Sequence, residues 1–384
     1  MTVYDDATTR GMSIHLKGRS SSNDAYHEPA PAALHTHPAH HDPEYDDRIR
    51  GIAETSLWVV CAISNPVRYK SRYALYRKFR YHITQELGLN LLTVECAHGD
   101  RDTQLTTDGI LDVVVETPNA STRTARTIDV RVRNSTFVWL KENLWNIGAR
   151  HLPHDCEYVL FADADIRFEN RHIATETIHA LQEYAVVQPF ETAADLGSNG
   201  EIIDVHRSFG YCHAHGWEWR PRTDGVGGYS SKPPPGVHAF GNSWHPGFAM
   251  AMRRRLLDTL PLLEVGALGA GDHHMCAAFI GKADLTFPKT IHQNYKKIVM
   301  AWQAKAAEFV RKNFGYVAGT ISHGWHGTKA NRKYVDRWTI LIRHAFDPET
   351  DVYRNSRGVV ELVDTKPGLR DDVRTYFRQR DEDA

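Results

Sequence analysis

The chain has 384 residues, of which 41% are hydrophobic and 24% are charged, as is ordinary for a soluble globular protein with a sizeable core. Its formal net charge is −1, so no overall electrostatic attraction draws it to nucleic acid or to an anionic membrane. No apolar signal segment opens the sequence and no uncharged run approaches about 18 residues. We therefore expect neither secretion nor a membrane span, and we expect a cytoplasmic protein.

The five cysteines indicate a reducing compartment. Their number is odd and they form no Cys-x-x-Cys pair, which favours free thiols packed in the core over disulfides. They stand at Cys61, Cys96, Cys156, Cys212 and Cys276.

Residues 1–50 are predicted to be a disordered tail, because they are rich in Ser, Ala, Pro, His, Asp and Arg and show almost no periodic apolar pattern. The His-rich run within this tail is interpreted as a solvated arm, since nothing there fixes a metal geometry.

From residue 56 onward, apolar runs that suit strands alternate with helical patterns. A strand is predicted over 56–64, and a helix over 65–87 with Pro66 in its first turn. Two strands follow over 90–96 and 109–118. The helix predicted next, over 137–152, has Asn134 or Ser135 as its cap.

A strand over 157–165 comes next. Residues 191–243 are predicted to form an irregular binding loop or lid, because they are long and rich in Gly and Pro. A strand and a helix follow over 245–260, and two further helices over 269–281 and 295–314. The alternation predicts an α/β fold with a mainly parallel sheet flanked by helices.

The stretch EYVLFADADIRF, residues 157–168, carries the strongest chemical signal. Its apolar strand runs directly into Asp163 and Asp165, at the strand end where open α/β sheets bind ligands. Residues i and i+2 of an extended chain point to one side, so both carboxylates are expected to face one spot. Such a pair repels unless a cation lies between them, which indicates a metal–diphosphate site. The alternative is a solvated turn or a helix cap.

The ordered set of motifs between Trp58 and Leu341 resembles the GT-A glycosyltransferases, which use nucleotide-sugar donors. The motifs are SNPVRYKSRY, DAD, HPGFAMAMRR, GAGDHHM and SHGWHG. The resemblance implies a Rossmann-like GT-A domain over 51–345, followed by a C-terminal extension over 346–384. The string SHGWHGTKANRKYVDRWTIL is similar to one in a phage, bacterial and large-DNA-virus group linked to glycosylation of modified DNA bases. If the protein is phage-encoded, we expect it to act in the cytoplasm of the host cell.

The resemblance assigns the metal site. It implies that Asp165 binds Mn²⁺ or Mg²⁺ directly, that Asp163 contacts the metal or the ribose, and that His323 or His326 is a further ligand, with His326 favoured. The alternative for the histidines is a loop in which they are ordinary hydrogen-bonding groups.

In the same way, Asp272 is implied as the general base that deprotonates the acceptor hydroxyl, which predicts an inverting enzyme. Its alternative role is to cap a helix. His273 and His274 are expected to bind the acceptor or the donor phosphate.

The donor is expected at the end of the first strand, where Arg side chains suit phosphate because their fork makes two hydrogen bonds. The implied donor-binding residues are Ser64, Asn65, Arg68, Arg72, Gly247 and Lys329. For most of the basic residues here, the alternative is a solvated helix face. Trp217 and Trp219 are interpreted as platforms for the acceptor or sugar.

The leading hypothesis is thus a metal-dependent hexosyltransferase that uses a UDP-sugar, with a hydroxymethylated base of phage or viral DNA as the acceptor, or else a glycan, lipid or protein. A nucleotidyltransferase is the second hypothesis, although CAISNPVRYKS lacks the glycines of a phosphate loop. A non-catalytic nucleic-acid-binding protein is the third, and the net charge disfavours it.

Overall fold

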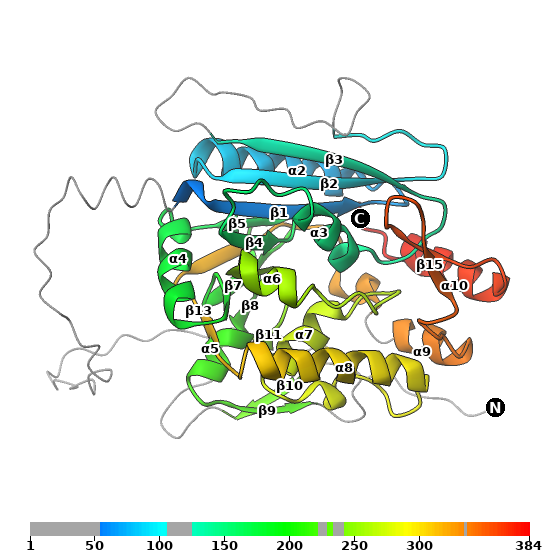
Figure 1. The fold of residues 1–384 in the computed structure, drawn as a ribbon. Helices are drawn as coiled ribbons and strands as arrows, with labels where there is room; N and C mark the ends of the chain where they lie inside the picture. Colours follow the sequence, from blue (N-terminus) through cyan, green and yellow to red (C-terminus); the bar gives the residue numbers. More distant parts are fainter. Residues whose placement is uncertain (1–53, 106–124, 222–228, 233–241, 334–335) are drawn as a thin grey trace, which may run out of the picture. The chain divides into compact units, whose positions relative to one another are not determined.

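A seven-stranded sheet with the strand order β13-β6-β12-β4-β1-β2-β3 forms the centre of the fold (Figure 1). The computed structural model describes residues 54–105, 125–221, 229–232, 242–333 and 336–384. Neighbouring strands are parallel except at β12, which is antiparallel to both β4 and β6. This confirms the predicted mainly parallel α/β sheet. The strands are β1 (Leu57–Ser64), β2 (Asn90–His98), β3 (Thr127–Asn134), β4 (Tyr158–Ala162), β6 (Val186–Gln188), β12 (Ala249–Arg253) and β13 (Phe314–Tyr316).

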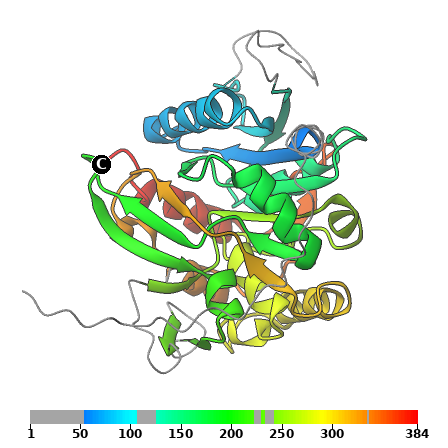
Figure 2. The ribbon, with the colours of Figure 1, turned by 90° about the vertical axis from the view of Figure 1, so that its left-hand side faces the viewer.

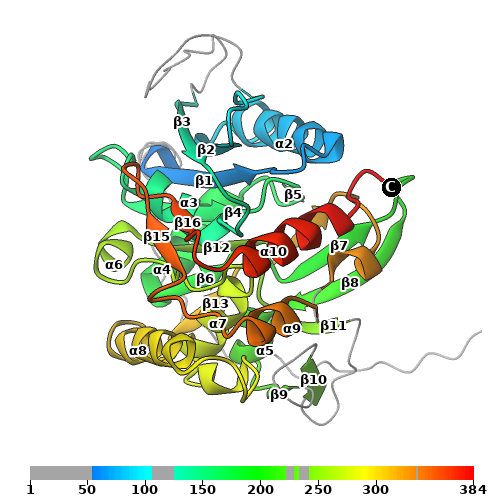
Figure 3. The ribbon, with the colours of Figure 1, turned by 90° about the vertical axis from the view of Figure 1, so that its right-hand side faces the viewer.

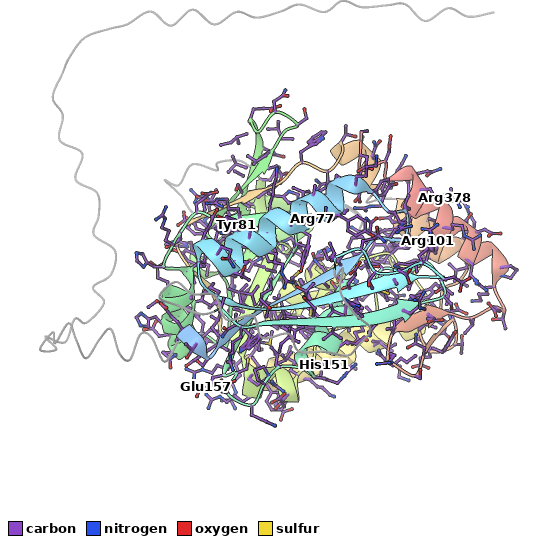
Figure 4. All side chains as sticks on the ribbon, turned by 90° about the horizontal axis from the view of Figure 1, so that it is seen from above. Arg77, Tyr81, Arg101, His151, Glu157 and Arg378 are labelled. Atoms are coloured by element: carbon purple, nitrogen blue, oxygen red, sulfur yellow. The ribbon has the colours of Figure 1, made fainter. Side chains whose placement is uncertain are left out.

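Helices cover both faces of this sheet (Figure 1 and Figure 2). Because side chains alternate along a strand, Val59 and Val60 enter two different hydrophobic clusters. The cluster with Val59 contains residues of α2 (Lys70–Tyr81) and α4 (Ile173–Glu183). The cluster with Val60 contains residues of α3 (Lys141–Ala149), α7 (Gly271–Phe279) and α8 (Gln293–Phe309). The outer face of α2 is solvated, with Arg77 and Tyr81 exposed (Figure 4).

A second sheet has five strands in the order β11-β8-β7-β14-β5. Its strands are β5 (Ile166–Phe168), β7 (Thr192–Leu196), β8 (Ile202–Ser208), β11 (Asn242–His245) and β14 (Thr320–His323). The prediction of an irregular segment over 191–243 is therefore wrong for β7 and β8. β7 pairs with β8 and with β14, which is more than 100 residues away, and β8 pairs with β7 and β11. Residues 222–228 and 233–241 of the predicted lid lie outside the described residues.

The remaining elements pack around these sheets. They are α5 (Phe209–Ala214), α6 (Arg254–Thr259), α9 (Asp336–Arg343), α10 (Pro367–Gln379), the hairpin strands β9 (Glu218–Pro221) with β10 (Tyr229–Lys232) and β15 (Val352–Arg354) with β16 (Val360–Leu362), a π turn over His82–Glu86, and 3₁₀ turns over Ala283–Leu285 and Lys329–Arg332. Apolar residues of α10, such as Val373 and Phe377, join the Val60 cluster (Figure 3). The boundaries at 50 and 345 stay predictions. None of the helices in the described ranges is long and apolar enough to cross a membrane.

Most predicted elements between 56 and 314 are confirmed, but two helices begin later than predicted. Residues 65–69 form a turn in which both amide atoms of Asn65 bond the backbone of Tyr69, so α2 starts at Lys70. The helix predicted over 137–152 starts at Lys141, because Asn134 directs its side-chain oxygen to the Thr136 N–H at 2.6 Å instead of capping it.

Two further outcomes concern a strand and the cysteines. The strand predicted over 109–118 lies outside the described residues. Strand β3, which sequence reasoning missed, occupies 127–134. All five cysteines are buried and free, as predicted.

Candidate active site

The segment Asp163-Ala164-Asp165 joins the two sheets, because it follows β4 and precedes β5. Backbone hydrogen bonds hold it on both sides: the Asp163 N–H donates to the Phe248 carbonyl at 2.7 Å, and the Gly324 N–H donates to the Asp165 carbonyl at 2.8 Å. The segment forms a turn, and its two carboxylates have different partners. The extended backbone expected here is therefore wrong, although burial and the nearby Asp165 carboxylate both raise the pKa of Asp163. That both carboxylates face one ligand stays a prediction.

Asp165 lies against two histidines, His323 at the end of β14 and His326 in the loop that follows it. The Nε2 atom of His326 is 3.3 Å from Asp165 Oδ2, the Nε2 atom of His323 is 3.7 Å from Asp165 Oδ1, and the two Nε2 atoms are 3.2 Å apart. All three side chains are at most 5% exposed. We call these residues, Asp165, His323 and His326, the Asp165 cluster. Sequence reasoning selected all three, and the structure brings them together.

The Asp165 cluster contains buried atoms that lack partners. In the described part of the chain, neither Asp165 Oδ1 nor His326 Nδ1 has a hydrogen-bond partner. An unpaired buried carboxylate oxygen is costly, and a bound cation would account for it. One carboxylate and two imidazoles are a donor set that suits a divalent transition metal. These residues therefore fit a metal ion.

Opposite charges offset the cost of burying the Asp165 cluster. Burial alone would raise the pKa of Asp165, but His323, His326 and Arg72 outweigh it and hold the pKa well below its usual range. Burial would lower the pKa of His323, but Asp165 and Asp195 raise it above its ordinary value. Burial lowers the pKa of His326 well below its ordinary value. The cluster thus holds an ionised carboxylate beside two imidazoles whose pKa values are shifted in opposite directions.

A second cluster lies beside the first and contains Asp163, Lys141 and Asp272; we call it the Lys141 cluster. The Lys141 ammonium is 3.3 Å from Asp163 Oδ1 and 3.0 Å from Asp272 Oδ2. Burial by itself would lower the pKa of Lys141, but the two carboxylates raise it well above its ordinary value. Sequence reasoning missed Lys141, because nothing in KENLW marks it and its partner Asp272 is 131 residues away.

Asp272 lies in the first turn of α7, where the N-cap position belongs to Ala270. Its predicted alternative role as the cap is therefore wrong; its Oδ1 accepts from the N–H of His273 at 2.7 Å. Burial would raise the pKa of Asp272, but Lys141 and the His273 N–H bond hold it well below its usual range. A Cβ atom at Gly247 would lie 3.0 Å from Asp272 Oδ2, so this small residue keeps the space beside the carboxylate open.

The backbone around the Lys141 cluster is strained. Phe248 has a φ of 76° and Ala270 a φ of 83°, values that residues other than glycine rarely adopt. The Phe248 N–H donates to Asp163 Oδ2 at 3.2 Å, and Ala270 leads into the helix turn that carries Asp272. Strain of this kind gathers at functional sites, where the surrounding structure holds it in place.

Glu142, which follows Lys141, gives the site a pH-dependent stability. It is 4% exposed, and its Oε1 atom has no hydrogen-bond partner within the described ranges. Burial, opposed in part by Lys141, raises the pKa of Glu142 from 4.5 to about 7. Between these values the folded chain keeps a proton that the unfolded chain has released. The free energy of unfolding therefore falls as the pH rises from 4.5 to 7, by about 3 kcal/mol if this carboxyl acts alone.

We expect Glu142→Gln to remove most of this fall, because an amide does not titrate. The measurement is urea unfolding at pH 5 and pH 8 for wild type, Glu142→Gln and the matched control Glu157→Gln, whose side chain is exposed (Figure 4). Wild type and the control should lose more stability between the two pH values than Glu142→Gln does. An equal loss in all three proteins would contradict the role of Glu142.

Arg72, a predicted donor-binding residue, connects the Asp165 cluster to the C-terminal segment. Its Nη1 atom is 3.0 Å from Asp165 Oδ2, and its Nε and Nη2 atoms both bond the carboxylate of Glu382. Glu382 also accepts from Arg380 Nε at 2.6 Å. The residues after α10 therefore lie against this site (Figure 3). The guanidinium fork binds carboxylates here, and its role toward a diphosphate stays a prediction.

The other predicted donor residues lie at the end of β1, with two exceptions. Ser64 Oγ is 3.0 Å from His98 Nε2, and Asn65 is buried in the turn before α2. Arg68, in the same turn, has a φ of 66°. Gly247 lies instead beside Asp272, and Lys329 begins a 3₁₀ turn after β14. The Lys329 side chain lies outside what the structure describes.

Three of the four predicted acceptor-binding residues are core residues. Trp217 and Trp219 are 5% and 3% exposed and belong to the Val60 cluster, so neither presents the open ring face that a platform needs. His274 is fully buried, and its two nitrogens bond Thr286 Oγ1 at 2.6 Å and Tyr295 Oη at 2.8 Å. The binding roles predicted for these residues are not supported. His273 follows Asp272 and is partly buried.

Asp195 and His206 were missed by sequence reasoning, although they adjoin the Asp165 cluster. Asp195 Oδ1 is 2.8 Å from His323 Nδ1, and Asp195 Oδ2 is 2.9 Å from His206 Nε2. Asp195, Asp204 and His206 lie close enough together to form a second possible metal-binding group. No motif in TAADL or IIDVHRS marks these residues, because strand pairing alone brings them to His323.

Comparisons with known proteins gave solved structures only. No protein-family model matches the chain, and no curated protein matches it in sequence. Glucosyl-3-phosphoglycerate synthase from Mycobacterium tuberculosis, solved with Mn²⁺, UDP-glucose and phosphoglyceric acid, is 11% identical, with 86% of this chain and 93% of that chain covered and a TM-score of 0.34. The catalytic domain of Drosophila β1,4-galactosyltransferase 7, solved with xylobiose, is 10% identical, with 83% and 98% covered and a TM-score of 0.31.

A synthase of another kind aligns at the same level. 4-Diphosphocytidyl-2C-methyl-D-erythritol synthase from Anaerococcus prevotii is 12% identical, with 70% of this chain and 89% of that chain covered and a TM-score of 0.29. Likenesses this low do not separate glycosyl transfer from nucleotidyl transfer. The function is therefore inferred from the chemistry of the Asp165 cluster and the Lys141 cluster.

Proposed function

We propose that the protein is a Mn²⁺-dependent glycosyltransferase of the GT-A type, which transfers a sugar from a nucleotide-sugar, UDP-sugars first, to an acceptor hydroxyl. The observation that carries this proposal is the Asp165 cluster, a buried carboxylate with an unpaired oxygen between two imidazoles. It lies where β4 of the large sheet ends, next to the end of β1. Open α/β sheets bind their ligands beyond such strand ends.

The donor set disfavours Mg²⁺, which the sequence left as the alternative to Mn²⁺. Mg²⁺ prefers oxygen ligands in an octahedral arrangement, whereas imidazole nitrogens suit transition metals. Asp165, His323 and His326 would hold the ion. When bound, it would act as a Lewis acid that neutralises charge on the departing nucleoside diphosphate.

In the proposed reaction the Lys141 cluster handles the proton. Asp272 Oδ2 accepts the proton of the acceptor hydroxyl as the hydroxyl oxygen attacks the anomeric carbon, and the bond from that carbon to the diphosphate oxygen breaks. This displacement inverts the anomeric configuration. Lys141 is a third participant that the sequence did not indicate. Its ammonium keeps Asp272 ionised and ready to accept a proton.

For the acceptor, we propose a hydroxyl group on a modified DNA base. This part of the proposal is supported only by the resemblance of the string at residues 322–341, and glycan, lipid and protein acceptors are the other arms of the test. Nucleotidyl transfer is the alternative reaction. It is disfavoured because CAISNPVRYKS, at the end of β1, contains no glycine to cradle a triphosphate.

A thermal-shift screen tests the donor class. UDP-, GDP-, dTDP- and CMP-sugars, and the four nucleoside triphosphates as the nucleotidyltransferase arm, are each added with and without Mn²⁺. A ligand at 100 times its Kd stabilises the native state by about 2.7 kcal/mol, which raises the melting temperature by a few degrees. We expect such a rise for one nucleotide-sugar series, with Mn²⁺ only. A rise with triphosphates alone, or no Mn²⁺-dependent rise, would refute the proposal.

A further inference from the structure

A line of polar side chains crosses three strands of the second sheet and ends at the Asp165 cluster. His323 on β14 is paired in register with Asp195 on β7, and Asp195 is paired with Asp204 on β8. Asp195 bonds His323 Nδ1 through one carboxylate oxygen, at 2.8 Å, and His206 Nε2 through the other, at 2.9 Å. Asp195 is 3% exposed and His323 4%, so water does not compete strongly for these bonds.

This geometry decides which nitrogen of His323 can bind a cation. A neutral imidazole has one N–H donor and one acceptor nitrogen, and a carboxylate next to Nδ1 requires the N–H to be there. The lone pair is then on Nε2, the atom that faces Asp165 Oδ1 and His326 Nε2. Histidine ligands of metal ions are commonly oriented in this way by a carboxylate behind them.

His326 provides an internal contrast. Its Nδ1 atom is buried without a hydrogen-bond partner in the described ranges, so no carboxylate bonds this ring on the side away from Asp165. Asp165 itself is held by Arg72. Of the three members of the Asp165 cluster, only His323 has a buried carboxylate behind its ring.

We propose that Asp195 is a positioning residue that fixes the tautomer and orientation of His323 and thereby sets the affinity of the Asp165 cluster for Mn²⁺. This inference rests on the proposed function, because it concerns the metal site of that reaction. In this proposal Asp195 acts through His323 and is not itself a ligand of the ion. Its bond to His206 fixes its second oxygen and so keeps the first aimed at His323.

The test is Mn²⁺ binding to the full chain without nucleotide, followed by electron paramagnetic resonance, because the six-line signal of free Mn²⁺ disappears on binding. Asp195→Asn keeps the shape of the side chain and removes its charge. Asp258→Asn, on the exposed end of α6, is the control, because it lies outside both possible metal-binding groups. We expect Asp195→Asn to weaken Mn²⁺ binding 10- to 100-fold, as the loss of such supporting carboxylates generally does, and Asp258→Asn to bind like wild type.

A purely structural role for Asp195 predicts a different result: a lower melting temperature without metal, and an unchanged Kd for Mn²⁺ in the folded protein. That result would overturn the inference and leave the proposed function standing. If wild type itself binds no Mn²⁺, the metal site and the inference fail together. Should Asp195→Asn not fold, nitrogen-15 spectra of wild-type histidines with diamagnetic Cd²⁺ decide the matter. Protonated Nδ1 and metal-bound Nε2 are expected for His323, and metal-bound Nδ1 would overturn the inference.

Discussion

Replacing Asp165 with asparagine is expected to reduce sugar transfer by about 1,000-fold, because the Lewis-acid contribution of a bound metal amounts to several kcal/mol of transition-state stabilisation. Asp165 is the only carboxylate in the cluster with His323 and His326. The same substitution should weaken Mn²⁺ binding by more than the 10- to 100-fold typical of residues behind the ligands. Transfer is measured by nucleoside diphosphate release, and Mn²⁺ binding by paramagnetic resonance.

Asp163→Asn is the matched comparison, since it alters the neighbouring carboxylate of the same motif. Asp163 contacts Lys141 and the Phe248 N–H instead of the two histidines. It should therefore keep the Mn²⁺ affinity of wild type, while Asp165→Asn loses it. Equal losses in the two variants would show that both carboxylates bind the ion, contrary to the separate clusters seen here.

Asp272→Asn should lower turnover by 10²- to 10⁴-fold, the range that a positioned general base contributes. The KM for the donor and the Mn²⁺ affinity should not change, because Asp272 lies in the Lys141 cluster and not among the metal ligands. Asp258→Asn, on the exposed end of α6, is the control and should keep full activity. Unchanged turnover in Asp272→Asn would remove the base assignment.

Lys141→Met tests the role of Asp272 as the general base through the pH dependence of the transfer rate. Lys141 holds the pKa of Asp272 below its usual range, so its loss should raise that pKa. A base must be deprotonated to act, so the acid limb of the rate profile should move to higher pH in Lys141→Met. An acid limb that stays in place while activity falls would assign Lys141 a role that is independent of Asp272.

Local patterns in the sequence predicted the elements that position the site. The apolar run of β4 ending at Asp163, the β12–α6 pair and the start of α7 were all readable, because each depends on residues close together in the chain. Strand β3 does show the alternation of a half-buried strand, with apolar Ile128, Val130 and Val132 between polar residues, so the local sequence contained a signal that was missed. Strands β7 and β8 were missed because they begin a region whose glycines and prolines suggested an irregular lid, and the local sequence does not show their pairing with β14 and β11.

The residues of the site fall into the same two groups: some stand in a recognisable local motif, and others are brought to the site only by the fold. Asp165, His323 and His326 could be selected because each stands in a short motif next to residues of unusual type. Lys141 and Asp195 stand in ordinary helix and strand sequences, and only the fold brings them to Asp272 and His323, 131 and 128 residues away. Trp217 and Trp219 show the converse error. Aromatic residues near a Gly-rich stretch suggested exposed platforms, whereas both indoles are in the core.

The most direct test of the metal-dependent donor site is the position of the ion itself. Crystals grown with Mn²⁺ and UDP would be measured at the manganese absorption edge, where the anomalous signal locates the ion. The account predicts a peak bounded by Asp165, His323 and His326, with the diphosphate bound to it. A peak elsewhere, for example between Asp195, Asp204 and His206, or nucleotide bound without any peak, would contradict it.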